Sequence, residues 1–247
     1  MKTISAIFWK EWRQQRWKLF FGTAMLLLFT GSMVAARISS DREIIVAVWI
    51  LGGLVLSLYS AMGVFGPERA ESTDLFYISK PIAAWKIFAC KWFFGWLNFA
   101  VPMILCVVLS VELFKRLHGR DFYELHGAIR GTFGVLLFST IFYSLTCCLA
   151  PRRAGPAGVG LAGLVVFVLI IVSAMPMQFI FPRIFESRTQ LSFIEQILCG
   201  ASPYMLLAVS VGDIRGVLGF SMPLILTEQI ILLMGVLYIG VRKWRKV

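Results

Sequence analysis

Few residues of this chain have types and spacing that could do chemistry, and the clearest is an acid inside an apolar run. Glu228 lies between Thr227 and Gln229. A carboxylate deep in a membrane costs ~2.5 kcal/mol or more, so it should face a cavity or a partner, or carry a proton. Glu228 and Gln229 therefore line a translocation path or a dimer seam, or Glu228 is a neutral acid hydrogen-bonded to a neighbouring helix. Asn98 is a weaker candidate for the same role, because Pro102, one turn later, favours a structural kink.

Three other patterns favour packing or solvation over chemistry. Gly158, Gly160 and Gly163 match G-x-G-x-x-G, but a dinucleotide site needs a preceding strand, and here the motif opens an apolar run. Close helix packing through small residues is the better explanation. His118 and His126 do not have a recognised metal-ligand spacing, and the five cysteines show no C-x-x-C pattern and fall mostly in apolar runs. The sequence predicts no metal site, no bound cofactor and no catalytic residue, so the chain is not expected to be an enzyme.

Composition places these residues in a membrane. Of the 247 residues, 59% are hydrophobic and only 15% are charged, which is typical of multi-span membrane proteins. Crossing the hydrocarbon of a bilayer takes about 20 helical residues, and we expect residues 1–247 to form one all-α transmembrane domain. Its six expected spans are residues 19–36, 44–65, 92–111, 131–150, 157–180 and 217–241.

A seventh apolar run, residues 191–211, contains Glu195 and the breaker Ser202-Pro203. We expect it to be a re-entrant or interfacial hairpin before the sixth span. With both termini inside, the inner segments then carry 15 of the 24 Lys and Arg residues and the outer segments nine. This bias follows the positive-inside rule. It predicts a multi-pass protein of the cell (inner or plasma) membrane with cytoplasmic N- and C-termini.

The first 18 residues combine aromatic and basic side chains. Ile4, Ile7, Phe8 and Trp12 share one helical face, from which Lys10, Arg13, Gln14 and Lys18 project away. This pattern suits an amphipathic helix lying in the headgroup layer of the bilayer. A cytoplasmic extension of the first span fits the periodicity equally well.

Residues 66–91 form a charged, proline-punctuated stretch between the second and third spans. We expect two short surface helices there, divided at Pro81. The charge bias places this stretch in the cytoplasm. Its polar half holds Glu68, Arg69, Glu71 and Asp74, and its apolar patch holds Leu75, Phe76 and Tyr77.

This arrangement resembles the permease subunits of ATP-binding cassette (ABC) exporters of the second type. The resemblance covers the architecture of nearly the whole chain. At residue level it rests on the acidic start at Glu68, on Ile78-Ser79-Lys80-Pro81-Ile82 and on the basic end at Lys91. A weaker similarity lies at Ser202-Pro203-Tyr204. The stretch Ala70-Glu71-Ser72-Thr73 departs from the Gly-Thr pair that family members commonly show.

The resemblance implies a coupling helix within residues 67–86 that rests in a groove of a separate ABC ATPase subunit. It also implies pairing with a second permease chain, as a homodimer or a heterodimer. ATP and magnesium would bind the partner, since this chain has no G-x-x-x-x-G-K-[ST] phosphate loop. The residues implied for coupling are Glu68, Arg69, Glu71, Asp74, Leu75, Phe76, Tyr77 and Pro81.

Two other classes of function stay open. An ATPase-independent scaffold, immunity or assembly factor would use the basic surface only to bind anionic lipid. A six-span secondary transporter would be expected to show internal repeats and several intramembrane ionisable groups. No nucleic-acid partner is expected in any of these classes, and the sequence does not identify a transported substrate.

Overall fold

The structure is a computed structural model that describes residues 2–35, 42–70, 83–118, 125–150, 155–187, 201–203, 206 and 222–245. The described part of the chain contains no strand, so the prediction of an all-α protein is confirmed there. Its helices are α1 (Lys2–Ala35), α2 (Arg42–Ala70), α4 (Ala84–His118), α5 (Leu125–Leu149), α6 (Pro156–Ser187) and α10 (Met222–Arg245).

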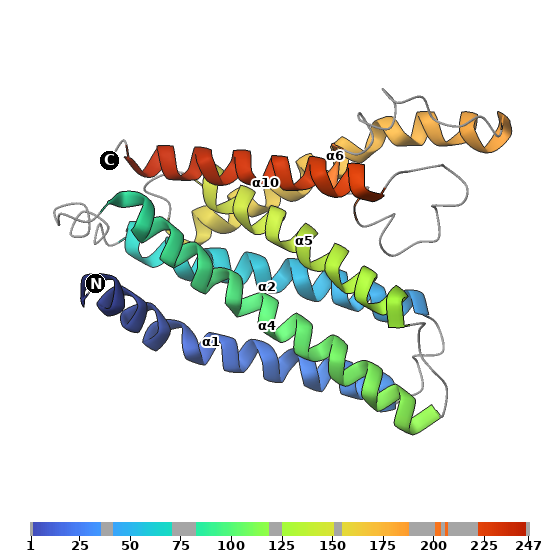
Figure 1. The fold of residues 1–247 in the computed structure, drawn as a ribbon, viewed down its shortest axis with the longest axis horizontal. Helices are drawn as coiled ribbons and strands as arrows, with labels where there is room; N and C mark the ends of the chain where they lie inside the picture. Colours follow the sequence, from blue (N-terminus) through green and yellow to red (C-terminus); the bar gives the residue numbers. More distant parts are fainter. Residues whose placement is uncertain are drawn as a thin grey trace.

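Consecutive helices run in opposite directions along one bundle (Figure 1). The N- and C-termini consequently lie at the same end, which we call the terminal end. Side-chain contacts agree with these directions, because residue 18 of α1 meets residue 63 of α2, and residue 243 of α10 meets residues 148 and 150 of α5. The terminal end therefore also holds the last turn of α2 and the first turn of α4.

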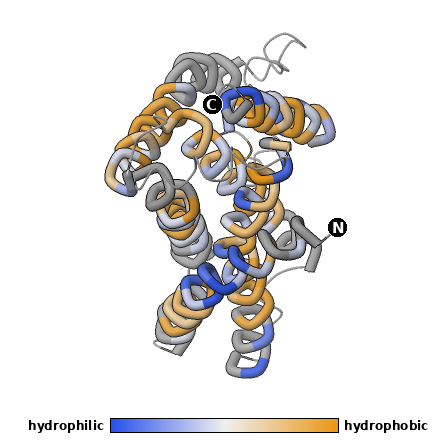
Figure 2. The backbone as a smooth tube through the Cα atoms, turned by 90° about the vertical axis from the view of Figure 1, so that its left-hand side faces the viewer, coloured by the Kyte–Doolittle hydropathy of each residue, from blue (hydrophilic) through white to orange (hydrophobic). Residues whose placement is uncertain are grey.

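Within the described residues, four helical segments are long and apolar enough to cross a membrane: Trp85–Leu109, Gly131–Leu149, Pro156–Ser173 and Pro223–Lys243. A shorter apolar helical run, Trp49–Val64, lies in α2. Hydrophobic residues also dominate the described helices when the bundle is viewed from the terminal end (Figure 2). The helices are therefore those of a multi-pass membrane protein.

Four of the six expected spans fall on these helices. The spans expected at residues 92–111, 131–150 and 157–180 coincide with apolar parts of α4, α5 and α6, and the span expected at 217–241 overlaps α10 from Met222 onward. Residues 217–221 lie outside the described residues, as does most of the hairpin expected at 191–211. Of that hairpin, Ser202 lies with its hydroxyl 2.9 Å from the Ser173 hydroxyl of α6.

Three helices, α2, α4 and α5, form the centre of the bundle, and each packs against the other two. α1 covers one flank, on α4 and α2, while α6 packs on α2 and α5, and α10 packs on α5 and α4. α4 and α5 approach closely because Gly95 has no side chain, and Val64 of α2 lies at the same point. Any larger residue at position 95 would overlap the Tyr143 ring, so the contact needs glycine.

The glycine motif of the fifth expected span is a packing motif. Gly160 faces Met62 of α2, and Gly163 faces Leu58 of α2 together with Thr146 of α5. A Cβ atom at position 163 would overlap the Leu58 side chain if nothing shifted. The prediction of close helix packing through small residues is therefore confirmed for these two glycines.

The N-terminal segment differs from the interfacial helix that we expected. It is continuous with the first expected span in one helix of 34 residues, α1, so the alternative of an extension of that span describes it better. Its buried face is polar, with Glu11 and Gln15 turned toward α4, while Trp9 and Trp12 are exposed. The polar face is buried because α4 offers partners for it, which the sequence periodicity of residues 1–18 does not reveal.

Candidate functional site

The structure describes the two ends of the expected coupling stretch. α2 continues past the expected span end at residue 65, through Pro67 to Ala70, so Glu68 and Arg69 belong to its last turn. α4 begins at Ala84, and both ends lie at the terminal end of the bundle (Figure 1). The remaining predicted coupling residues lie outside the described residues: Glu71, Asp74, Leu75, Phe76, Tyr77 and Pro81.

Next to these two ends, α1 forms a line of polar contacts with α4 and α2. The Lys91 ammonium donates a hydrogen bond to the Glu11 carboxylate at 2.9 Å, and both side chains are only 1% exposed. Farther along the same pair of helices, the Asn98 amide donates to the Gln15 amide oxygen at 3.0 Å. We call these four side chains, together with Lys18 and the carbonyl group of Gly63, the polar seam.

Lys18 extends the polar seam to α2. Its ammonium donates a hydrogen bond of 3.0 Å to the Gly63 carbonyl oxygen. A helical carbonyl normally accepts from the amide four residues later, but here that residue is Pro67, which has no N–H. Lys18 thus satisfies a carbonyl that α2 itself leaves open. Burial lowers the pKa of Lys18, and the Glu11 carboxylate opposes this shift.

The same geometry recurs in α4. Pro102 lies inside this helix and leaves the carbonyl of Asn98 without its usual amide partner. Gly22 of α1 packs at this point, where an added Cβ atom would lie 3.8 Å from the Asn98 carbonyl oxygen. Because Gln15 also holds the Asn98 side chain, α1 contacts both residues whose helical hydrogen bonds are removed by proline in α2 and α4.

The spacing of the residues that α1 contributes to the polar seam shows that they share one helical face, but not that this face is buried. Positions 11, 15, 18 and 22 follow each other at intervals of four, three and four residues, which places them on one face of a helix. Sequence reasoning followed the aromatic residues and the exposed cations instead, and it placed Lys91 at the basic end of a surface stretch. In the structure Lys91 is buried against Glu11.

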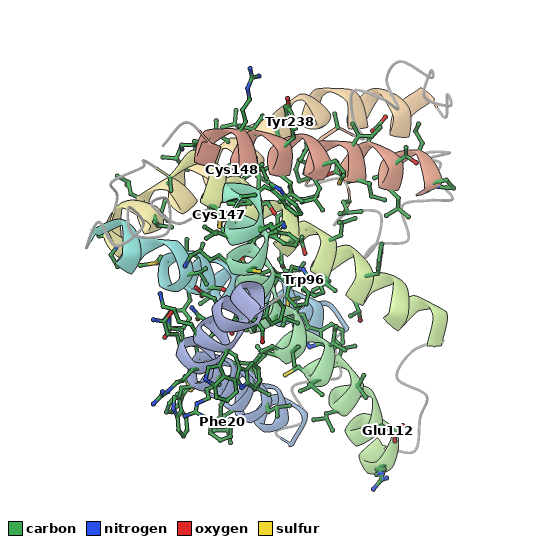
Figure 3. All side chains as sticks on the ribbon, turned by 60° about the vertical axis from the view of Figure 1, so that its left-hand side comes forward. Phe20, Trp96, Glu112, Cys147, Cys148 and Tyr238 are labelled. Atoms are coloured by element: carbon green, nitrogen blue, oxygen red, sulfur yellow. The ribbon has the colours of Figure 1, made fainter. Side chains whose placement is uncertain are left out.

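Aromatic and hydroxyl side chains hold α4 to α5. The indole N–H of Trp92 donates to the Ser144 hydroxyl at 3.0 Å, and that of Trp96 donates to the Thr140 hydroxyl at 2.9 Å. Figure 3 shows Trp96 between the helices, whereas Phe20 and Tyr238 point outward from different sides of the bundle. Buried donors with partners stabilise the pairing of two central helices.

The three residues predicted for a path or seam occupy different places. Asn98 is buried and bonded to Gln15, so its described role is to join α1 and α4. Gln229 is fully buried on the inner face of α10, beside Ile225. Glu228 flanks that face, and its buried Oε2 atom accepts no hydrogen bond from the described part of the chain. No hydrogen bond between described residues joins Asn98 to Glu228.

The C-terminal helix is fixed to the end of α5. The ammonium of Lys243 donates hydrogen bonds to the Cys148 and Ala150 carbonyl oxygens at 2.7 and 2.8 Å. These carbonyls lie in the last turn of α5 and just after it, where helices leave acceptors open. A lysine is well suited to this position.

The described residues contain no group of three or more His, Cys, Asp and Glu side chains that could hold a metal ion. Cys90, Cys106, Cys147 and Cys148 are buried thiols, as the packing interpretation predicts. Comparisons with family models, with curated proteins and with solved structures found no match to the chain.

Proposed function

We propose that this chain is the membrane-spanning permease subunit of an ATP-driven ABC exporter of the second type. A separate ATPase subunit binds the stretch between the second and third spans through residues 67–86, and its cycle of ATP binding and hydrolysis moves the helices of the permease. The chain crosses the cell membrane six times with both termini in the cytoplasm, and it works with a second permease chain.

The observation that carries the proposal is the position of residues 66–91. They connect α2 to α4, two of the three central helices, at the end of the bundle that holds both termini. A displacement applied there is delivered directly to the core. Moving a peripheral connection would displace a flank without moving the centre.

The charge distribution supports the orientation. The segments assigned to the terminal end carry most of the Lys and Arg residues of the chain, which is typical of the cytoplasmic side. Among these residues are Arg242 and Lys243 in the described end of α10, and Arg13 and Arg16 in the described start of α1. With an even number of spans, both termini lie on that side.

The exposed faces of α6 and α10 support contact with lipid and with a second chain. Only 22% of the apolar window of α6 and 17% of that of α10 are buried within the bundle. Leu164 and Val168 of α6 and Ile231 and Met234 of α10 are exposed apolar side chains. Glu228 lies between this outer face and the buried Gln229. We propose that both residues line a translocation path or a dimer seam.

The proposal is tested by purifying the affinity-tagged chain from its native membrane in a mild detergent. We expect an ABC ATPase to accompany it in a ratio of one ATPase to one permease, measured by quantitative mass spectrometry. A chain that purifies without an ATPase would refute the proposal and favour the scaffold class.

A pair of glutamate variants then tests the coupling stretch. Glu68→Gln should lower the ATP hydrolysis of the reconstituted complex, because it removes a charge from the expected docking segment. Glu112→Gln is the matched control, since Glu112 is exposed near the opposite end of α4. Equal activities of the two variants, with equal insertion in the membrane, would exclude Glu68 from coupling.

A further inference from the structure

We infer that α1 is a splint for the two helices that carry the coupling stretch, with Glu11 and Lys18 as positioning residues. This inference rests on the proposed function and assigns a task to a helix outside the coupling stretch. The splint passes a displacement of residues 66–91 to the bundle as a rigid movement. Without α1, bending of α2 and α4 would absorb the displacement.

Both α2 and α4 are weakened by a proline. A proline in a helix removes one backbone hydrogen bond and is a common site of bending. Pro67 lies in the last turn of α2, at the start of the stretch, and Pro102 lies inside α4. Both helices that connect to the coupling stretch therefore have a defect at which they can bend.

α1 spans both of these proline defects. Lys18 binds the Gly63 carbonyl that Pro67 leaves open, at 3.0 Å. Gln15 binds the side chain of Asn98, whose carbonyl Pro102 leaves open, and Gly22 packs against that carbonyl and the Pro102 ring. One helix, α1, thus contacts the bundle at both proline defects.

α1 cannot slide along α4 without a large cost in free energy. Glu11 and Lys91 are both 1% exposed and bonded at 2.9 Å, and separating a buried ion pair leaves two charges without compensation. Phe8 adds an edge-on contact with Phe94, with ring centroids 4.7 Å apart. Lys91 lies about two helical turns after the start of α4, so α1 holds α4 close to the point where force would enter.

The splint can be tested on the chain alone by amide hydrogen exchange. Lys18→Met removes the donor to Gly63 and should speed exchange of the amides of residues 60–70 by about tenfold or more. Lys18→Arg retains a donor and should restore much of the protection. Lys86→Met is the matched control, because Lys86 is at the same end of the bundle and contacts the Trp85 ring rather than the polar seam. Unchanged exchange in Lys18→Met would overturn the splint.

The second arm uses the complex with its ATPase. Spin labels at Phe20 and Tyr238, which are both exposed, report the distance between α1 and α10 before and after trapping with ADP and vanadate. We expect a shift in the complex with native Lys18 and Lys86 and in the Lys86→Met complex. The shift should fall to less than about half in Lys18→Met, while ATP hydrolysis continues.

The possible outcomes separate the two hypotheses. A complex that hydrolyses ATP and shows the same shift in Lys18→Met, or no shift with the native lysines, would overturn the splint and leave the proposed function intact. If no ATPase accompanies the chain with native Lys18, the proposed function is wrong, and the role of α1 in transmission falls with it.

Discussion

Replacing Lys91 with methionine tests the buried ion pair between α1 and α4. The change removes the ammonium but keeps a long apolar stem, so packing against α1 is largely retained. Glu11 then remains 1% exposed without the cation that lies 2.9 Å away in the native chain. The variant therefore isolates the cost of an uncompensated buried carboxylate.

The expected magnitude follows from this burial. Removing one partner of a buried ion pair typically costs ~3–5 kcal/mol, whereas replacing both partners with apolar residues of similar size is often neutral or stabilising by ~1–4 kcal/mol. We therefore expect Lys91→Met to lower the free energy of unfolding by about 3–5 kcal/mol. The double variant Glu11→Met with Lys91→Met should lie within about 1 kcal/mol of the native chain or above it. Lys86→Met, which removes a cation 5.6 Å from the Trp85 ring centroid, should cost at most about 1 kcal/mol.

The assay is reversible unfolding by sodium dodecyl sulfate in mixed micelles, followed by circular dichroism. All four chains are measured in the same lipid–detergent mixture, so that the unfolded reference is shared. A cost below about 1 kcal/mol for Lys91→Met would show that the carboxylate is solvated and that the pair is not buried. A double variant as unstable as the single one would show that Lys91 acts through packing and not through Glu11.

Two further predictions concern the contacts of α5. Gly95→Val should lower the free energy of unfolding by about 1–3 kcal/mol or more, because the added methyl groups overlap the Tyr143 ring. The same unfolding assay measures this change. A neutral result would contradict the close approach of α4 and α5. Lys243→Met should leave the Cys148 and Ala150 carbonyls without a charged donor and lower the free energy of unfolding by about 1.5–3 kcal/mol. Amide exchange in the last turn of α10 should become faster. Arg242→Met, at an exposed neighbouring position, is the control that should change little.

Composition and hydrophobic periodicity were enough to predict the class of the protein. The all-α prediction holds for the described residues, and four helices have the length and apolarity of spans. The glycine pattern of α6 was also correctly assigned to packing, because a dinucleotide site requires a strand that the flanking residues do not provide. These properties are local, so they can be recognised from neighbouring residues.

The polar seam could not be predicted in the same way. Glu11 and Lys91 are 80 residues apart in the chain, and Gln15 and Asn98 are 83 apart. Nothing within residues 1–18 shows that a polar face will find partners in α4. An amphipathic pattern indicates which two faces differ, but it does not decide which of them is buried when polar partners are available elsewhere.

The candidate path residues show the same difficulty. Asn98 was singled out because it is polar in an apolar run, and the structure pairs it with Gln15 of α1. Glu228 was singled out for the same reason, and its Oε2 atom is buried without a hydrogen bond from the described residues. Polarity inside a span predicts that a residue has a special environment. The type of environment depends on which helices are neighbours.

The separation of Glu11 from Lys91 along the chain has a consequence for biosynthesis. α1 leaves the ribosome before α4. The side chains of Glu11 and Gln15 are therefore held in the insertion machinery, in the headgroup layer or in water until residues 91 and 98 have been synthesised. This polar face delays the packing of α1 against the bundle, because the hydrogen-bond partners of Glu11 and Gln15 lie on α4. α1 is thus synthesised before α4 and can reach its final contacts only after α4 has entered the membrane.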